Sequence, residues 1–483
     1  MDCSMNYRRI NANQIEAIAA PFPISIFANE DVHIEKAAYT ELEELTNLSD
    51  TLGRFYAAAP EAFAGEPAVD RIVVTPDFHK GAGIPIGAVL KTRNCYLPRA
   101  MGSDIGCGMS LFVVHGISPD EVTRNKDAVV EALRRIFFGG ARDIALNASQ
   151  RTAILTDGIR GLLNAVPGHG ALWETLENNR GGLAGCVSAS HAAERSPVFE
   201  TFCGHDKPSH DTQTGSIGGG NHFVEIQRVK KVFDRGRAWQ AGLKEGSLVV
   251  MAHSGSLSVG STAAAHLDAL VKQAFPRGIG KPWGNFYPLP LGRSPLNAAV
   301  ANIIGNAANF ASVNRVMLGL MAVRALSMSI APATCTLLHD AHHNFIEPAE
   351  DDTVIHRKGA CRAAAGEYVI IPGSMGSSSF LLAGHGNEAA LSSACHGAGR
   401  AYSRGAAMGR SDDAMERFMK EFTIVTPVDL RRVRSDVRRK KLAELSQEAP
   451  FAYKDITPAI ETVTNAGMAS PIAELFPVLT VKS

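Results

Sequence analysis

The hydrophobic and polar positions of this chain follow two periods, which predict both helices and strands. Apolar residues recur at helical spacing over residues 31–48, and a long apolar stretch at 295–330 predicts a buried helix. Ser118-Pro119-Asp120-Glu121 is a capping box with proline at the first helical position, so a helix should run to about residue 137. Short apolar or β-branched runs predict strands at 71–75, 110–115, 223–226 and 247–252.

Glycine turns that carry potential ligands adjoin several of these strands. Residues 76–83 follow the first strand and hold Asp77, His79 and Lys80, so we expect either a loop that belongs to a site or an Asp-capped turn. Asp104 and Cys107 lie three residues apart among glycines, where a carboxylate and a thiolate could share one metal ion or bridge two.

Histidines occupy similar positions further along the chain. His222 follows the glycine run 218–220, and His253 follows the strand at 247–252. His342 and His343 are adjacent, and spacing alone cannot choose between them. One carboxylate, one thiolate and three imidazoles suit one or two divalent transition metals, such as manganese, zinc or cobalt.

Phosphate-binding features accompany these ligands. Residues 395–400 read Cys-His-Gly-Ala-Gly-Arg, and Arg404 follows four residues after Arg400. If a helix begins after the glycines, both guanidinium groups lie on one face and suit phosphate recognition. The alternative is a glycine-rich turn with a packed histidine and solvated arginines. Lys358 and the small-residue loop 371–379 add a cation and backbone N–H groups, so metals, phosphate and the imidazole of His396 together indicate phosphoryl or nucleotidyl transfer.

Composition limits the partners and the compartment. Forty-eight basic and 48 acidic residues cancel, so nucleic acid would need a local basic patch. The basic run 431–441 is more simply a solvated helix face than such a patch. Eight cysteines without a Cys-x-x-Cys pair, no apparent signal peptide and no apolar run of membrane-spanning length predict a cytoplasmic protein with free thiols.

With these motifs the sequence closely resembles the RtcB family of tRNA-splicing ligases, which are GTP- and manganese-dependent 3′-phosphate RNA ligases. The matching motifs keep the family's order along most of the chain. They are Pro76-Asp77-Phe78-His79, Asp104-Ile105-Gly106-Cys107-Gly108, Gly219-Gly220-Asn221-His222-Phe223, His253-Ser254-Gly255-Ser256, His343-Asn344, Arg357-Lys358-Gly359-Ala360, Pro372-Gly373-Ser374-Met375-Gly376, Cys395-His396-Gly397-Ala398-Gly399-Arg400 and the penultimate Lys482.

The resemblance implies a role for each matching residue. His396 matches the histidine that becomes guanylylated, and His343 is the member of the histidine pair that matches a ligand. The implied set of ligands for two manganese ions, with Cys107 bridging, is Asp104, Cys107, His222, His253 and His343. The implied contacts to GTP are Asn221, Glu225, Asn344, Ser374, Ser379, Gly397, Ala398, Gly399, Tyr453 and Lys482. The implied phosphate and RNA contacts are Lys358, Arg400 and Arg404.

The resemblance also implies a reaction and a fold. A guanylylated histidine would pass GMP to an RNA 3′-phosphate, which can come from a 2′,3′-cyclic phosphate, and a 5′-hydroxyl end would then be joined. We expect an α+β fold over residues 1–483, as one large domain with mixed sheets around a central cleft for two metal ions. Residues 150–215 form a possible family-variable insertion, and the protein should be a monomer or homodimer.

One position departs from the family pattern. In the family the His-Ser-Gly-Ser motif is followed by arginine, whereas here Leu257 follows. Leucine cannot donate a hydrogen bond, so a lost phosphate contact costs on the order of 1.5–3 kcal/mol. The chain could therefore be a divergent paralogue that binds RNA ends or nucleotide without ligation. A metal-dependent phosphohydrolase is the third candidate.

Overall fold

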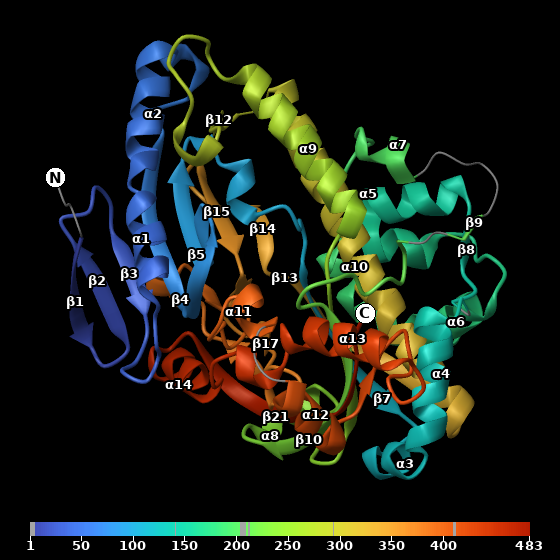
Figure 1. Ribbon diagram of the computed structural model, residues 1–483. Coiled ribbons are helices and arrows are strands. Elements are labelled where there is room, and N and C mark those ends of the chain that lie inside the picture. The colour runs from blue at the N-terminus through green and yellow to red at the C-terminus, as the bar shows by residue number, and fades with distance from the viewer. Residues whose placement is uncertain (1–4, 141, 203–208, 211–212, 293, 409–411) are drawn as a thin grey trace.

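The computed structural model describes residues 5–140, 142–202, 209–210, 213–292, 294–408 and 412–483. The protein has the expected α+β fold, with two large mixed sheets and helices around them (Figure 1). The prediction that residues 1–483 form one domain, with an insertion at 150–215, stays a prediction.

The first large sheet is built mainly from the N-terminal part of the chain. Its strand order is β1-β2-β3-β4-β5-β15-β14, and its β3–β4 pair is parallel. The strands are β1 (Asn6–Asn11), β2 (Gln14–Ile18), β3 (Ile24–Phe27), β4 (Ala68–Ala82), β5 (Ile84–Arg93), β14 (Asn344–Pro348) and β15 (Thr353–Lys358).

The second large sheet joins strands from the middle and the end of the chain. Its order is β13-β7-β11-β10-β21-β18-β17, and β20 pairs in parallel with β21. The strands are β7 (Gly108–His115), β10 (Phe223–Val232), β11 (Leu248–Ser254), β13 (Thr334–His342), β17 (Tyr368–Ile371), β18 (Ser379–Gly384), β20 (Ile424–Val425) and β21 (Ala469–Val481).

Short strand pairs and helices complete the described part of the chain. The short pairs are β6 (Cys95–Tyr96) with β12 (Leu289–Pro290), β8 (Ala145–Leu146) with β9 (Ser209–His210), and β16 (Ala360–Arg362) with β19 (Ser393–Cys395). The α-helices are α1 (Lys36–Glu44), α2 (Asn47–Ala58), α3 (Pro119–Arg124), α4 (Lys126–Phe138), α5 (Ala148–Asn164), α6 (Ala171–Leu183), α7 (Val198–Phe202), α8 (Arg235–Gln240), α9 (Leu257–Ala274), α10 (Pro295–Ser329), α11 (Arg404–Met408), α12 (Asp412–Glu421), α13 (Ser435–Ser446) and α14 (Thr457–Asn465). The 3₁₀ helices are η1 (Pro60–Ala62), η2 (Pro98–Met101), η3 (Ala184–Ala189), η4 (Trp283–Asn285), η5 (Glu388–Ala390) and η6 (Pro450–Ala452).

Helix α10 is the centre of the largest hydrophobic core. It covers the predicted stretch 295–330 almost to the residue, and side chains on all its faces are buried because it packs against β7, β11 and β13 on one side and α4, α5 and α9 on others. Asn306 and Asn309 on this helix both donate to the carbonyl of Leu155, next to a kink in α5. The kink leaves carbonyls of α5 without helical partners, and these amides satisfy one of them.

The local sequence signals were accurate at some elements and wrong at others. The single helix expected to run to about residue 137 is two helices, α3 and α4, with Asn125 between them. The capping box at Ser118 is present and starts α3, and Glu121 donates its backbone N–H to the Ser118 hydroxyl. The expected loop at 76–83 is instead strand, because β4 continues to Ala82. Its pairing with β5 is irregular, with register shifts on both sides of His79, so the bulged strand keeps the turn-like residues within the sheet.

The register of the second sheet brings the predicted ligands to one edge. β7 begins at Gly108, directly opposite Ser254 at the end of β11 and His342 at the end of β13. On the other side of β11, Phe223 at the start of β10 pairs with His253. Because these neighbouring strands are antiparallel, the first residues of β7 and β10 lie beside the last residues of β11 and β13 at one end of the sheet.

None of the helices in the described part of the chain combines the length and the apolar character required to cross a membrane.

Candidate active site

Residues of both large sheets line a cavity of about 740 Å³. His79 on β4 and Lys358 on β15 come from the first sheet, and Met109 on β7 and His253 on β11 come from the second. The predicted site residues in the cavity wall are Asp104, Cys107, Asn221, His253, His343, Asn344, Lys358, Ser374, His396, Gly397, Ala398, Gly399, Arg400, Arg404, Tyr453 and Lys482. The predicted residues outside that wall are His222, Glu225 and Ser379, all of which are buried.

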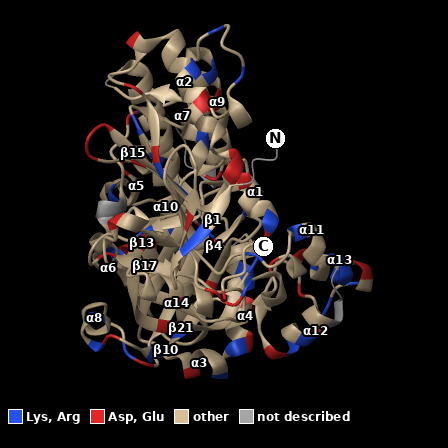
Figure 2. Cartoon of the chain, turned by 90° about the vertical axis from the view of Figure 1, so that its left-hand side faces the viewer, with Lys and Arg blue, Asp and Glu red and all other residues tan. Residues whose placement is uncertain are grey.

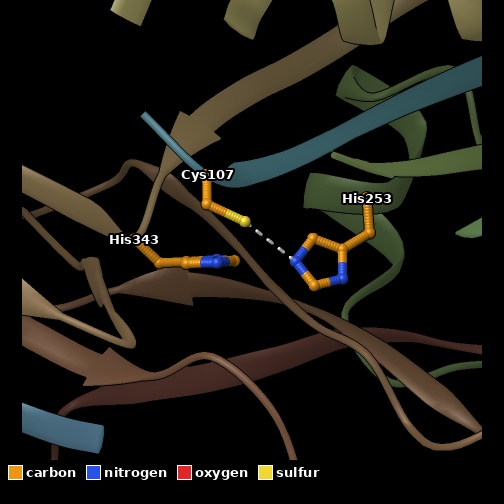
Figure 3. A group of neighbouring side chains, drawn as sticks. All are labelled: Cys107, His253 and His343. Atoms are coloured by element: carbon orange, nitrogen blue, oxygen red, sulfur yellow. Dashed lines mark hydrogen bonds between the residues drawn. The ribbon is translucent and has the colours of Figure 1, made fainter. Parts of the chain in front are cut away.

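The five predicted metal ligands form two groups that share Cys107. One group is Cys107, His253 and His343, whose side chains face one another in Figure 3, and the other is Asp104, Cys107 and His222. The Cys107 Sγ lies 3.4 Å from Nε2 of His253 and 3.3 Å from Nε2 of His222. The same His222 nitrogen lies 3.0 Å from Oδ2 of Asp104. A single sulfur between two groups of ligands suits a bridge between two ions.

Hydrogen bonds to Nδ1 of His222 and His253 orient the Nε2 atoms of both rings toward the sulfur of Cys107. Nδ1 of His222 bonds the carbonyl of Ile217 at 3.0 Å, and Nδ1 of His253 bonds the carbonyl of Asn221 at 3.1 Å. Each bond makes Nδ1 the protonated nitrogen and leaves Nε2 as a lone-pair donor. Nδ1 of His343 is buried without a hydrogen-bond partner among the described residues. A buried orphan nitrogen beside a cysteine and a second histidine fits a divalent metal.

Burial keeps Cys107, His253 and His343 uncharged when no ion is bound. Burial, and then the neighbouring Asp104, raise the pKa of the Cys107 thiol well above its usual value. Burial, and then nearby histidines, lower the pKa of His253 and His343 well below the usual value. Neutral imidazoles are already in the form that binds metal, whereas the thiol must release its proton to an incoming divalent ion.

Glycine is required where the ligand loops approach each other. A Cβ on Gly255 would lie 2.1 Å from Oδ1 of Asp104, and the next residue, Ser256, donates its backbone N–H to that oxygen at 3.2 Å. The His-Ser-Gly-Ser turn therefore holds the Asp104 carboxylate through its backbone, which only a residue without a side chain allows.

His396 forms a pair with the buried carboxylate of Asp77. Nδ1 of His396 lies 2.5 Å from Oδ2 of Asp77, and the Thr75 hydroxyl donates to Oδ1 at 2.6 Å. Asp77 is fully buried; although burial raises its pKa, the effect of His396 and the hydrogen bonds outweigh it and lower the pKa below the usual value. An ionised Asp77 fixes the proton of His396 on Nδ1, so Nε2 carries the lone pair of a nucleophile.

His396 lies directly beside the candidate metal ligands. The ring centroid of His396 lies 4.7 Å from that of His343. Gly399, with φ +73°, follows His396 and passes so close to Asp77 that a Cβ there would lie 2.7 Å from the Asp77 carbonyl. This glycine turn therefore packs the loop of His396 onto β4, which carries Asp77.

The predicted phosphate-binding arginines are joined by an acid that the sequence did not indicate. Helix α11 begins only at Arg404, so Arg400 precedes it and the two do not share a helix face as expected. Both nevertheless bond Glu448, with Nη1 of Arg400 at 3.3 Å from Oε2 and Nε of Arg404 at 3.2 Å from Oε1. Tyr453 also donates its hydroxyl to Glu448.

Two of the predicted GTP contacts, Glu225 and Ser379, are linked through Gln227. Its amide donates to Glu225 at 2.6 Å and to the Ser379 hydroxyl at 3.1 Å, and Thr480 donates to the other Glu225 oxygen. Burial raises the pKa of Glu225 to about 7. Lys482 donates to the carbonyls of Gly220 and His222, and burial lowers its pKa to about 8.

Lys358 is also held by backbone carbonyls. Its ammonium donates to Ile84 at 2.6 Å and to Ala82 at 3.4 Å, and burial lowers its pKa to about 8. Asn344 donates to the Asp104 carbonyl at 3.2 Å and accepts from the backbone N–H of Gly359 at 2.9 Å. These contacts tie the ligand loop of Asp104 to the turn that carries Lys358.

Two other stretches of the sequence carry polar or basic residues. The segment with His205, Asp206 and His210 could hold metal ligands but is more simply a surface loop; His205 and Asp206 lie outside the described residues, and His210, which belongs to β9, is not part of the cavity wall. The basic run 431–441 is mostly exposed and lies at and before α13, where the cartoon of Figure 2 shows Lys and Arg positions interspersed with Asp and Glu positions. Arg432 pairs with Asp429 and Arg434 with Asp436, so these charges are paired at the surface, but both arginines precede α13 and only the later part of the run lies on a helix.

Sequence reasoning missed the functional importance of several residues because their partners are distant in the chain. Asp77 was noted within a motif but not as the partner of His396, which is 319 residues away. Glu448 and Gln227 lay in no recognised pattern. A buried acid or amide that would otherwise lack a partner is a signal only once the fold is known.

The comparisons with known proteins agree with this geometry. Residues 61–483 match the family model described as "tRNA-splicing ligase RtcB". "RNA-splicing ligase RtcB" of Mycobacterium tuberculosis is 32% identical over 440 residues, covering 84% of this chain and 95% of that protein. "tRNA-splicing ligase RtcB" of Thermococcus kodakarensis is 30% identical over 447 residues, covering 85% and 87%, and "RNA-splicing ligase RtcB2" of Escherichia coli is 28% identical over 460 residues, covering 94% of each. The chain therefore belongs to the RtcB family of tRNA-splicing ligases.

Proposed function

We propose that this protein is a GTP-dependent RNA ligase that joins 3′-phosphate or 2′,3′-cyclic phosphate ends to 5′-hydroxyl ends through a guanylylated His396, in tRNA splicing or RNA repair. The observation that carries the proposal is the Asp77–His396 pair beside the cysteine-centred ligand groups. A histidine with a free Nε2 next to metal ligands fits nucleophilic attack on a phosphate, and family membership supplies RNA as the substrate.

Two manganese ions are the proposed metal cofactors. Asp104, Cys107 and His222 would hold one ion, and Cys107, His253 and His343 the other. When bound, such ions neutralise phosphate charge and so make the phosphorus accessible to a nucleophile. The soft thiolate together with imidazoles and a carboxylate is compatible with manganese and also with zinc or cobalt.

The first proposed step is the attack of His396 Nε2 on the α-phosphorus of GTP. The new N–P bond forms as the bond to the β-phosphate oxygen breaks, and pyrophosphate leaves. Asp77 holds the Nδ1 proton, and its negative charge stabilises the positive imidazole ring that attack produces. Lys358, Arg400 and Arg404 in the cavity wall are the proposed cations for GTP or RNA phosphates.

The later steps transfer GMP and then release it. An oxygen of the RNA 3′-phosphate attacks the guanylyl phosphorus, and the His396–phosphorus bond breaks. A cyclic phosphate first requires hydrolytic opening to give this 3′-phosphate. The 5′-hydroxyl of the second RNA then attacks the activated 3′-phosphorus, which forms the phosphodiester and releases GMP.

The nucleotide contacts are proposed from the resemblance and from their place in the structure. Tyr453, Lys482, Glu225 and Ser379 would contact guanine. The proposed contacts to the remainder of the nucleotide are Asn221, Asn344, Ser374, Gly397, Ala398 and Gly399, which line the cavity. A cytoplasmic location and a monomeric or homodimeric state remain predictions from the sequence.

The test is incubation with GTP labelled at the α-phosphate in the presence of manganese. We expect label to remain covalently attached to the unaltered protein and to be absent from His396→Ala. His385→Ala is the matched control, because this exposed histidine bonds Gly467 and Ser470 and is not part of the cavity wall. Absence of label from folded, manganese-loaded protein would contradict the proposal.

A second candidate follows from Leu257. Leu257 stands where the family has an arginine that would contact phosphate. A family member that binds RNA ends or nucleotide without ligating them would not need that contact. Supplying labelled protein with 3′-phosphate and 5′-hydroxyl RNA separates the two, since only a ligase converts them to a joined product. Release of phosphate without GTP would instead indicate a phosphohydrolase.

A further inference from the structure

The fully buried Asp77 orients two imidazoles, of which His396 is only one. The backbone carbonyl of Asp77 lies 2.7 Å from Nδ1 of His79, while its carboxylate bonds Nδ1 of His396. A carbonyl oxygen can only accept a hydrogen bond, so Nδ1 of His79 carries the ring proton and Nε2 carries the lone pair. One residue therefore fixes the same tautomer in both histidines.

The Nε2 atom of His79 is available to a ligand in the cavity. His79 lines the same cavity as His396 and is only partly buried. The register of β4 against β5 shifts on both sides of His79, and such bulges re-aim side chains from the sheet. Among the described residues, Nε2 of His79 has no hydrogen-bond partner. The cavity thus holds a second imidazole lone pair besides that of His396.

Asp77 also joins the two segments that carry these rings. A Cβ on Gly399 would lie 2.7 Å from the Asp77 carbonyl oxygen, which is the atom that accepts from His79. The Asp77 carboxylate accepts the backbone N–H of His396 as well, at 3.2 Å. The loop of His396 is therefore packed onto the stretch of backbone that holds His79, and both rings adjoin the same buried acid.

His79 is neutral near pH 7, which is the form that a base requires. Burial lowers its pKa to about 4, which the hydrogen bond to the Asp77 carbonyl and the Asp77 charge oppose and the neighbouring His396 and Lys454 reinforce. The Lys454 ammonium donates to the carbonyl of Phe78, directly before His79, at 3.3 Å. Phosphates bound in the cavity would raise the pKa of His79 again, because negative charge favours the imidazolium form. His79 therefore gains basicity when RNA binds.

The joining step of the proposed reaction is the step that must remove a proton from its nucleophile. His396 attacks GTP through a lone pair, and an RNA 3′-phosphate attacks as an anion. A 5′-hydroxyl, in contrast, must lose its proton as it attacks, and a positioned side chain accelerates such a transfer. The leaving GMP is a phosphate, which needs no acid. A proton acceptor in the cavity is therefore required when the two RNA ends are joined.

The other bases described in the cavity wall are less suited to this transfer. Glu448 is engaged by two arginines and a tyrosine, and the proposed metal ligands and His396 have roles of their own. Glu35 accepts the backbone N–H of Lys80 at 2.8 Å and so supports the bulge next to His79. His79 is instead tied to Asp77, the residue that holds the nucleophile.

We propose that His79 is the general base of the joining step, and that its Nε2 accepts the proton of the RNA 5′-hydroxyl as this oxygen attacks the activated 3′-phosphorus. The bond between the 5′-oxygen and phosphorus forms, the bond from this phosphorus to the oxygen shared with GMP breaks, and GMP leaves with the electron pair. The proton then passes from His79 to solvent. The inference rests on the proposed function and assigns a residue to its last chemical step.

The test isolates joining by starting from RNA that already carries GMP on its 3′-phosphate. This RNA and a 5′-hydroxyl RNA are mixed with excess manganese-loaded protein in the absence of GTP, and the joining rate is measured for the unaltered protein and for His79→Ala. We expect His79→Ala to join the ends about 10²-fold more slowly, while its labelling by α-labelled GTP stays within a few-fold. A loss of labelling as large as the loss of joining would contradict a role confined to the last step.

A 5′-amino RNA distinguishes a base from a residue that only positions the RNA end. An amine attacks through its own lone pair and can lose its proton after the N–P bond has formed, so it depends less on a base. His79→Ala should therefore join 5′-amino RNA at a rate close to that of the unaltered protein. Equal losses with the two nucleophiles would overturn the inference.

A second variant and a control cover the remaining outcomes. His79→Asn carries an amide that can donate to the Asp77 carbonyl but cannot take up a proton, so it should show the same selective loss as His79→Ala. His385→Ala changes an exposed histidine outside the described cavity wall and should join both RNAs at the rate of the unaltered protein. Normal joining of 5′-hydroxyl RNA by folded His79→Asn would refute the role of His79. Failure of the unaltered protein to take label or to join would overturn the proposed function itself.

Discussion

The guanidinium of Arg315 and the carboxylate of Asp340 form a two-pronged ion pair that is completely buried behind the candidate metal ligands. Nε lies 2.7 Å from Oδ1 and Nη2 lies 2.9 Å from Oδ2, and neither side chain is exposed. Nη1 donates to the carbonyls of Gly106 at 2.7 Å and Ser254 at 3.0 Å. Gly106 precedes Cys107 and Ser254 follows His253, so one arginine from α10 fixes the backbone beside two proposed ligands.

Arg315→Met should destabilise the protein strongly. The substitution leaves the buried Asp340 without its cation, and removing one partner of a buried pair costs about 3–5 kcal/mol of unfolding free energy. Chemical denaturation of the two proteins measures the difference. Arg93→Met is the matched control, because its pair with Asp70 lies at the surface, where such a pair contributes about 0–1 kcal/mol. Equal losses for the two variants would contradict the structural role assigned to Arg315.

Asp77→Asn should slow guanylylation much more than it changes metal binding. An amide cannot hold the Nδ1 proton of His396 as a carboxylate does, so the Nε2 tautomer and the stabilisation of the charged ring are lost. Such changes cost on the order of 10²–10⁴-fold in rate. Single-turnover labelling with α-labelled GTP measures the rate, and the manganese content of the same sample is the control. A rate within a few-fold of the unaltered protein would exclude this role for Asp77.

The sequence predicted much of the local structure that carries the site. Local periodicity and capping depend only on residues close together in the sequence. They predicted the buried helix at 295–330, the capping box at Ser118 and the strand at 110–115. The ligand types were also visible, because cysteine, histidine and aspartate beside glycine at strand ends are uncommon by chance. The α+β fold class was expected from the resemblance to the family.

What the sequence could not predict depends on contacts between distant segments. Pro76, Gly81 and Gly83 indicated a loop, yet β4 continues to Ala82 because β5 and its neighbours provide the pairing. Spacing could not distinguish His342 from His343. In the structure the ring of His343 faces His253 and His396, whereas Nδ1 of His342 bonds Gly106 on another side. Alternation along the end of β13 explains the difference, but only the sheet register reveals which face holds the site.

Cys107→Ala should remove more metal than the loss of any other single ligand. Cys107 belongs to both ligand groups, whereas Asp104 belongs to one and His343 to the other. After loading with manganese and removal of free ions, elemental analysis should give a lower metal-to-protein ratio for Cys107→Ala than for Asp104→Ala or His343→Ala. Cys335→Ala, which changes another buried cysteine, is the control and should keep the ratio of the unaltered protein. Equal ratios for Cys107→Ala and the unaltered protein would refute the bridging role.

The preference for GTP over ATP should weaken as the pH falls below about 7. Burial raises the pKa of Glu225 from 4.5 to about 7, so at lower pH its carboxyl is protonated and cannot accept both N–H groups of guanine. With only the ionised fraction competent, the GTP-to-ATP ratio of labelling efficiencies should fall about ten-fold from pH 8 to pH 6. Protonation of the proposed metal-binding histidines lowers labelling by GTP and by ATP equally. Its effect therefore cancels in the GTP-to-ATP ratio. Glu225→Gln should show a low ratio that does not vary with pH. A ratio that stays constant for the unaltered protein would mean that Glu225 does not contact guanine as an ionised group.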